Sequence, residues 1–330
     1  MGQSDGRVRQ TGGIIILSVV TALATALALT ALWFQAVPPW RWLWMAVVAA
    51  TSVGIMVAGP GRRKIAWGAL AVAVFSGCVW WTSIKPSNDR AWAPDVAHGV
   101  TAGINGADVV LHNVRNFDWK TETEAVERWE TRRYSLDKLT SADLVSSVWS
   151  SPAIAHTLIS FGFADGRHVV FSAEVRREKG EEFSEVGGFF KQFELVMIAA
   201  DEDDIIRLRT NVRKENVTLL PLRVTPAQAR ALFLGFAARA NSLAESAQWY
   251  QTVTTNCTTV IFELARHVDQ RVPLDWRILL SGYLPGYLYE LGVIRTDIPL
   301  EQVLREAAIS QKALSAPTDA DYSRVIRAGN

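Results

Sequence analysis

Hydrophobic residues are concentrated in the first quarter of this chain, in three long stretches separated by short breaks. The stretches cover residues 14–34, 41–58 and 65–83, and the breaks between them contain QAVPPW and PGRRK. About 20 apolar residues are needed for a helix to cross the hydrocarbon core of a bilayer. The pattern therefore predicts a membrane anchor of three transmembrane helices over residues 1–84. Tryptophans lie at the ends of these stretches, as in the aromatic belts of membrane proteins: Trp33, Trp40, Trp42, Trp44, Trp80 and Trp81.

The basic residues that flank the spans predict their orientation. Arg7 and Arg9 precede the first span, three basic residues occupy 62–64 between the second and third, and the other loop carries only Arg41. Because basic loops stay in the cytoplasm, the N-terminus and the 62–64 loop are expected there, with everything after residue 84 outside. A cleaved signal peptide is the alternative for the first span. Its weak basic flank, its long apolar core and the two further spans favour a retained helix.

This orientation predicts the result of a fusion experiment. A reporter enzyme that is active only outside the cytoplasm should work when it is fused after Asn330, because an odd number of spans precedes that position. The same reporter fused at Gly61 should be inactive. Activity at Gly61 and silence at Asn330 would contradict the predicted orientation.

The rest of the chain changes from strand-like to helix-like patterns. Residues 85–100 are polar and proline-containing and are interpreted as a linker, so the domain proper is expected over 101–330. Helices are expected at 225–246, with Thr225 as N-cap, and from Cys257 onward. A short helix and turn are expected over 273–292, and one more helix after about residue 300. This order predicts an α+β domain. Strands are expected at 107–119, 141–151, 153–163, 168–178, 188–201 and 204–212.

Charge and motifs exclude several function classes. The chain has 34 Lys and Arg against 33 Asp and Glu, which is a net charge of +1, so no nucleic-acid partner is predicted. It contains no CxxC, HExxH, P-loop or GxSxG motif, and its five histidines are scattered. We therefore expect no cofactor and no metal site. The oligomeric state is not predicted.

The two cysteines are separated by the membrane boundary. Cys78 lies in the third span, whereas Cys257 lies in the external domain, so a disulfide between them is not expected. An unpaired cysteine in an oxidising compartment indicates a reactive thiol or an intermolecular bond. The alternative is a buried, inert cysteine that packs as a small apolar residue.

The position of Cys257 favours reactivity. Thr255 and Asn256 are good capping residues, and Val260, Ile261, Leu264 and Val268 lie on one face of the helix that would follow. Cys257 would then occupy the first helical turn, where free N–H groups and the helix dipole lower the pKa of a thiol. The N–H groups at Asn256 and Thr258 are candidates for holding an oxyanion.

A thiol nucleophile also needs a base, and His156 is the candidate. It lies in the apolar strand 153–163, where a satisfied core histidine is the alternative role. If the hairpin turn centres on Asp165, then His156 faces Glu174 across the two strands, and the carboxylate could orient the ring. A two-residue Asp-Gly loop would instead place Glu174 on the other face, where it could pair with Arg176 or Arg177. Should Glu174 prove dispensable, Ser172 and His168, which share its strand face, are the next candidates for the third role.

The blocks AHT at 155–157, SAEVRRE at 172–178 and NCTT at 256–259, in that order, resemble the DUF4105 family, also described as the Lnb N-terminal periplasmic domain. The resemblance covers about two-thirds of the chain. It implies a circularly permuted papain-like fold of the NlpC/P60 type, with Cys257, His156 and Glu174 as the catalytic residues. It also implies the inner membrane of a bacterium, with the C-terminal domain in the periplasm. The named relative is a lipoprotein N-acyltransferase.

Two features depart from the family pattern. The membrane spans precede the domain here, whereas the named acyltransferase has them after it, and residue 251 is Gln where the family often has Asn. We expect a membrane-anchored cysteine acyltransferase or hydrolase that forms an acyl thioester and acts on lipid or lipoprotein acyl groups. A cysteine hydrolase of cell-wall peptides and a non-catalytic periplasmic scaffold are the alternatives.

Overall fold

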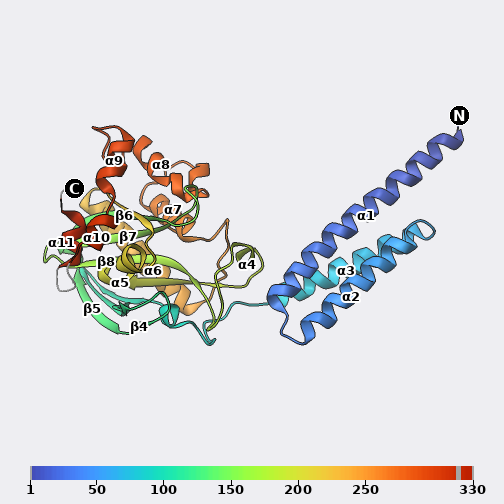
Figure 1. Cartoon of the computed structure of the whole chain (residues 1–330), viewed down its shortest axis with the longest axis horizontal. Coiled ribbons are helices and arrows are strands. Elements are labelled where there is room, and N and C mark those ends of the chain that lie inside the picture. The colour runs from blue at the N-terminus through green and yellow to red at the C-terminus, as the bar shows by residue number, and fades with distance from the viewer. Residues whose placement is uncertain (1, 317–320, 329–330) are drawn as a thin grey trace. The chain divides into compact units, whose positions relative to one another are not determined.

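The computed structural model describes residues 2–316 and 321–328, with side chains from residue 11 onward (Figure 1). The described residues form two compact units. The first unit consists of residues 1–86 and a short insertion, 184–192. The second consists of the described residues within 87–183 and 193–330.

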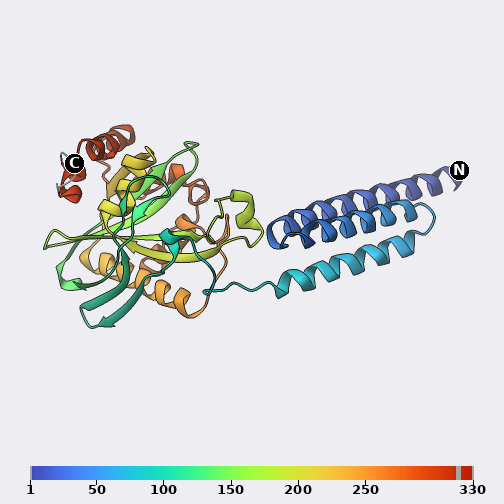
Figure 2. The same ribbon diagram turned by 60° about the horizontal axis from the view of Figure 1, so that its bottom comes forward.

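The first unit contains the predicted membrane helices. They are α1 (Gly2–Gln35), α2 (Trp40–Ala58) and α3 (Arg63–Ser83), which lie side by side in Figure 2. Among the described residues, these three are long and apolar enough to cross a membrane, which confirms the prediction from the sequence. Few of their apolar side chains are buried within the unit, as expected for helices whose surroundings are lipid.

Contacts among the three helices are small and local. Leu17, Ile55, Ala66 and Leu70 form a compact apolar cluster. The hydroxyl groups of Thr25 and Ser52 are hydrogen-bonded at 2.6 Å, which joins α1 to α2. Hydroxyl pairs of this kind add directional contacts where lipid provides no hydrophobic driving force for helix association. The insertion at 184–192 contains α4 (Glu185–Phe189) and completes the unit.

The second unit is built around one sheet. Within the described residues, the main path of the sheet has the order β1-β2-β9-β8-β7-β6-β10, and β5 pairs with β2. Neighbouring strands are antiparallel, except that β2 and β9 run parallel. The strands are β1 (Thr101–Asn105), β2 (Asp108–Arg115), β5 (Trp129–Ser135), β6 (Leu139–Val148), β7 (Ala155–Phe163), β8 (His168–Arg176), β9 (Glu194–Ala200) and β10 (Asn216–Pro221). A small separate ladder joins β3 (Asp118–Trp119) to β4 (Ala125–Val126).

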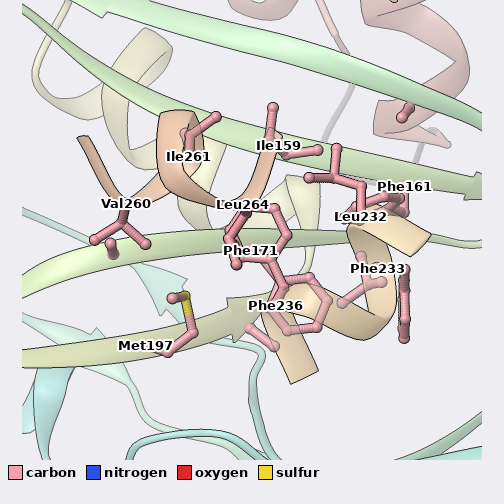
Figure 3. Close-up of a cluster of buried hydrophobic side chains, with 14 of the residues drawn as sticks. Ile159, Phe161, Phe171, Met197, Leu232, Phe233, Phe236, Val260, Ile261 and Leu264 are labelled. Atoms are coloured by element: carbon pink, nitrogen blue, oxygen red, sulfur yellow. The ribbon is translucent and has the colours of Figure 1, made fainter. Parts of the chain in front are cut away.

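Both faces of this sheet are covered. On one face, side chains of α6 (Pro226–Glu245) and α7 (Cys257–Val268) pack on alternate residues of β7 and β8. Figure 3 shows this core, in which rings from α6 meet Phe161 and Phe171 of the sheet. On the other face, Leu158 and its neighbours pack against α5 (Glu202–Arg207) and the last helices of the chain. The structure is therefore α+β, as predicted.

Several local predictions agree with the structure. Thr225 caps α6 with a reciprocal capping box to Gln228, and Pro226 is the first helical residue. The stretch 273–292 forms two single turns and a short helix, η4 (Trp276–Ile278), η5 (Ser281–Tyr283) and α8 (Leu284–Glu290). The tail was expected to hold one helix, but three short ones lie within its described residues: α9 (Leu300–Ala307), α10 (Ser310–Leu314) and α11 (Tyr322–Arg327).

The strand predicted at 204–212 is wrong. This stretch forms the end of α5 and a π-helical turn, η3 (Leu208–Val212). The consecutive residues Ile205 and Ile206 are both fully buried, and successive residues of a strand would point to opposite faces. Acidic residues fill the first turn of α5, where the helix dipole favours negative charge. The strand at this place in the fold is β10, which follows the helical turn.

Most of the stretch predicted to be a linker is part of the second unit. From Ser87 onward it belongs to that unit, and its regular structure is the single turn η1 (Pro94–Val96). Ala93, Val96 and Val100 are buried. A further turn, η2 (Leu136–Lys138), joins β5 to β6.

Candidate active site around Cys257

The register of the β7–β8 hairpin sets which side chains face each other. Ile159 pairs with Phe171 and Gly162 pairs with His168, so the turn centres on Asp165. Gly166 in this turn has φ +82°, a left-handed conformation that glycine adopts at low cost. The same register continued toward the strand end places His156 opposite Glu174. The predicted register is therefore confirmed, and the alternative two-residue loop is wrong.

The two strands of this hairpin separate just where His156 lies. Their ladder ends at Ile159 and Phe171, but β7 continues to pair with β6 as far as Ala155, and β8 continues with β9 as far as Arg176. Helix α7 contacts both strands. The gap between the strands therefore leaves backbone and side-chain groups of β7 accessible to the first residue of α7.

Cys257 is the first residue of α7, as predicted, and Asn256 is its N-cap. The Asn256 side chain accepts hydrogen bonds from the N–H groups of Thr258 at 3.0 Å and Thr259 at 2.9 Å. The Thr259 hydroxyl accepts one from the Asn256 N–H at 2.7 Å. This capping box holds the start of the helix rigidly and fixes the direction of the Cys257 side chain.

The cap changes the predicted oxyanion site. The N–H groups of Asn256 and Thr258 are both used inside the cap, so they are not available to a ligand in this arrangement. Asn256 and Thr258 are better described as residues that position the helix start. The amide at the helix start that the cap does not use is the N–H of Cys257 itself.

His156 joins the thiol to a carboxylate. Its Nε2 lies 3.0 Å from Oε1 of Glu174 and 2.8 Å from the Ser172 hydroxyl, which in turn donates to Glu174 at 2.7 Å. The His156 side chain is also hydrogen-bonded to Cys257. Because Nε2 faces Glu174 and Ser172, Nδ1 is the nitrogen left for the thiol. The side chains of His156 and Glu174 are 15% and 19% exposed, so both groups are largely buried but still in contact with solvent.

Two further residues of the site were missed by reasoning from the sequence. Arg209 is buried and donates to Glu174 at 3.2 Å from the π-helical turn η3. Thr157 is fully buried, and its backbone N–H and hydroxyl both donate to Cys257. Its hydroxyl also lies 3.0 Å from that of Thr258. Arg209 lay in the segment predicted to be a strand. Thr157 is the last residue of the AHT block, so the family resemblance was a signal that could have pointed to it.

The electrostatics of these contacts favour an ion pair. Burial opposes the charge on each group, but the charges of Glu174 and Cys257 raise the pKa of His156 to about 9. Burial likewise disfavours the thiolate, yet His156 and the Thr157 donors lower the pKa of Cys257 to about 6. Despite burial, His156 and Arg209 hold the pKa of Glu174 well below its usual value. At neutral pH the site therefore holds a thiolate, an imidazolium and a carboxylate.

The remaining histidines lie elsewhere. His98 packs edge-on against Trp129, and the exposed side chain of His112 contacts Thr131. His168 lies beside the hairpin turn, and His267 contacts the carbonyl of Glu263 within its own helix. Of the two reserve candidates for the third position, Ser172 is in the site and His168 is not.

The segment that carries η4 and η5 borders His156. Ser281 donates to the Ala155 carbonyl at 2.6 Å and accepts from the Ala155 N–H at 2.9 Å. A Cβ at Gly282 would lie 2.0 Å from the carbonyl oxygen of Pro152, so only glycine allows this close approach. Four large apolar side chains of the segment are nevertheless exposed: Trp276 (58%), Leu279 (47%), Leu280 (39%) and Tyr283 (42%).

The ion pair predicts a two-step pH dependence for the reaction of Cys257 with iodoacetamide. The rate should rise as pH passes about 6, because Cys257 ionises there, and should change again near pH 9, where His156 loses its proton. Below neutral pH, Cys257 should react faster than a free cysteine. A single step near pH 8.5, the usual value for a free thiol, would contradict the ion pair. The measurement is the labelling rate between about pH 5 and pH 10 in a Cys78→Ala variant, in which Cys257 is the one remaining cysteine.

The family model described as the Lnb N-terminal periplasmic domain matches residues 125–282, which include Cys257, His156 and Glu174. No curated protein and no solved structure matches the chain, so the permuted papain-like topology stays a prediction. The periplasmic domain and the three apolar helices fit a membrane protein with a periplasmic C-terminal domain. The stretch that matches the Lnb N-terminal periplasmic domain thus contains the AHT, SAEVRRE and NCTT blocks that carry the resemblance seen in the sequence.

Proposed function

We propose that this protein is a membrane-anchored periplasmic thiol enzyme that carries an acyl group on Cys257. The observation that supports this most directly is the unbroken chain of contacts from Cys257 through His156 to Glu174. A buried, inert cysteine would need none of these partners, and structural cysteines in apolar surroundings have raised rather than lowered pKa values.

The proposed reaction has two steps. The Cys257 thiolate attacks the carbonyl carbon of an acyl donor, and the N–H of Cys257 stabilises the negative charge that develops on the carbonyl oxygen. The bond to the leaving group then breaks, and the His156 imidazolium gives its proton to that group, leaving an acyl thioester on Cys257. In the second step, neutral His156 takes a proton from an amine or from water as it attacks the thioester. The thiolate leaves and the ion pair is restored.

An acyl chain from a lipid or lipoprotein is the substrate class that the surroundings favour. The exposed apolar side chains of η4 and η5 belong to a segment whose Ser281 is hydrogen-bonded to Ala155, the residue before His156. Exposed apolar groups next to a polar reaction centre are typical of sites for apolar ligands. The membrane helices of the same chain hold the enzyme near such a substrate. An amine acceptor would make the protein an acyltransferase, and water would make it a hydrolase.

Intact-mass analysis of the protein purified from native membranes tests this proposal. We expect a fraction of the protein to carry an added mass that maps to Cys257 after digestion, and that is lost on treatment with hydroxylamine, which cleaves thioesters. The size of the addition would identify the acyl group. An addition that matches a cell-wall peptide would contradict the lipid substrate and support the peptide hydrolase. No addition, together with an unreactive Cys257, would support the non-catalytic scaffold.

Substituting Glu174 with Gln should lower turnover moderately and leave the fold intact. The amide can still contact His156 Nε2, but it removes the negative charge that stabilises the imidazolium and can favour the wrong tautomer. The loss of this partly buried carboxylate also leaves Arg209 without its charged partner, so a small fall in thermal midpoint is expected. The rate of acyl-enzyme formation should fall by about 10–100-fold, less than for Cys257→Ala.

Asp165→Asn is the matched control for this variant. Asp165 lies in the turn of the same hairpin and pairs with exposed Arg167, so its substitution should change stability alone. Full turnover in Glu174→Gln would reassign the third role to Ser172, which contacts the same ring nitrogen.

A further inference from the structure

The insertion 184–192 lies in the sequence of the periplasmic domain but packs with the membrane helices. It interrupts the second unit between Phe183 and Phe193, whose rings stack at 6.2 Å and close the base of the insertion. Ser184 caps its short helix α4 by accepting from the N–H of Gly187 at 3.0 Å. The insertion therefore has its own local structure and a defined exit and return point in the chain.

Polar contacts attach the insertion to the ends of two spans. The Gln35 side chain, at the last residue of α1, donates to the carbonyls of Phe190 at 2.8 Å and Lys191 at 2.7 Å. The Lys191 ammonium group donates to the carbonyl of Trp81 at 2.7 Å, near the end of α3. A cation at this place complements the negative end of the helix dipole and satisfies a terminal carbonyl.

Aromatic contacts reinforce this attachment. Phe190 stacks on Phe34 with ring centroids 5.9 Å apart and meets Trp81 edge-on at 6.3 Å. The Lys191 ammonium group lies 4.6 Å from the centre of the Trp81 ring. Because these partners are in the last turns of α1 and α3, the insertion is held at the level where the spans leave the hydrocarbon core. Aromatic rings of membrane proteins concentrate at this level.

Two large apolar side chains of the insertion remain uncovered. Val186 is 52% exposed and Phe189 is 49% exposed, and their spacing of three residues places them on one face of α4. Trp33, in the same turn of α1 as Phe34, is exposed to a similar extent at 47%. The exposed apolar pair therefore lies on an element that Phe190 and Lys191 attach to the ends of the spans.

We propose that residues 184–192 form an interfacial element that inserts Val186 and Phe189 into the boundary between the lipid headgroups and acyl chains of the outer leaflet. The chain around it is acidic at Glu181, Glu182 and Glu185, so the partner is the apolar boundary rather than the charge of anionic lipids. The chain then connects the periplasmic unit to a membrane-bound segment at the insertion as well as at residue 86. This proposal does not depend on catalysis at Cys257.

A fluorescent probe at position 186 tests the insertion in the full chain. In a Cys78→Ala, Cys257→Ala background, Val186→Cys is labelled with the environment-sensitive dye NBD and reconstituted into phosphatidylcholine vesicles. Val126→Cys is the matched control, because Val126 is an exposed valine (50%) of β4 in the second unit. We expect blue-shifted emission at 186, with several-fold stronger quenching by a lipid that carries a spin label near the top of its acyl chain. The signal should not change when anionic phosphatidylglycerol is added.

Phe189→Cys provides an independent second site and should behave like Val186→Cys. Emission and quenching at both sites equal to those at position 126 would overturn the proposal, because both side chains would then be in water. A blue shift without lipid quenching would also overturn it, since a second copy of the chain or another protein would then cover this face. Strong dependence on anionic lipid would replace the apolar insertion with an electrostatic contact.

Discussion

Turnover should fall by at least about 10⁴-fold when Cys257 is replaced by alanine, because the proposed acyl thioester forms on the sulfur of this residue. The fold should survive, since the start of α7 is held by Asn256 and Thr259 rather than by the thiol. The side chain is partly exposed and small, so we expect the free energy of unfolding to change by no more than about 1 kcal/mol. The measurements are the turnover rate in membranes, the intact mass and the thermal midpoint.

Cys78→Ala is the control for this variant. Cys78 is exposed on α3 and plays no part in the site, so its removal should leave turnover and the acyl adduct unchanged. Retained turnover in Cys257→Ala would exclude covalent catalysis at this residue. A large loss of stability would instead indicate that Cys257 is a structural residue.

Replacing His156 with alanine should return the pKa of Cys257 from about 6 toward about 8.5, the usual value for a thiol. At pH 6 the thiolate population would then fall about 100-fold. A more basic thiolate is intrinsically more nucleophilic by about tenfold over this interval, so the net loss in iodoacetamide labelling should be about tenfold. Turnover should fall further, by about 10²–10⁴-fold, because the proposed general acid and base is lost as well.

His168→Ala is the matched control for the histidine. It removes a ring from the neighbouring strand of the same hairpin, but that ring contacts the turn at Gly166 and not the thiol. Its labelling profile should overlie that of the parent protein. A His156→Ala variant with an unchanged profile would show that the helix start alone lowers the pKa of Cys257.

The features that the sequence determined by itself are those whose signals lie close together along the chain. The length of the apolar stretches alone specifies α1, α2 and α3, because the bilayer fixes the length of a spanning helix. Asn256 and Thr259 cap the helix that begins at Cys257, and a capping box needs only four consecutive residues. The Asp-Gly pair at 165–166 located the hairpin turn, but it left two registers open, and the strand pairing in the structure decided for the one that brings His156 to Glu174.

Tertiary structure decided the features that depend on distant segments. Ile205 and Ile206 became helical because both sides of the sheet had to be covered, and a burial requirement of this kind overrides weak local preference. Arg209 reaches Glu174 only because η3 packs on the face of β8 that carries this carboxylate. The N–H of Thr157 meets the thiol because β7 and β8 separate there while each keeps its other neighbour.

The structure of the insertion 184–192 also depends on distant segments of the chain. Its aromatic residues Phe189 and Phe190 run on into the strand-like residues that follow, and the sequence predicted one strand over 188–201. Its structure is decided by Gln35 and Trp81, which lie more than a hundred residues earlier in the chain. Such contacts form only when the loop that joins them is closed, so no short window of sequence carries their signal.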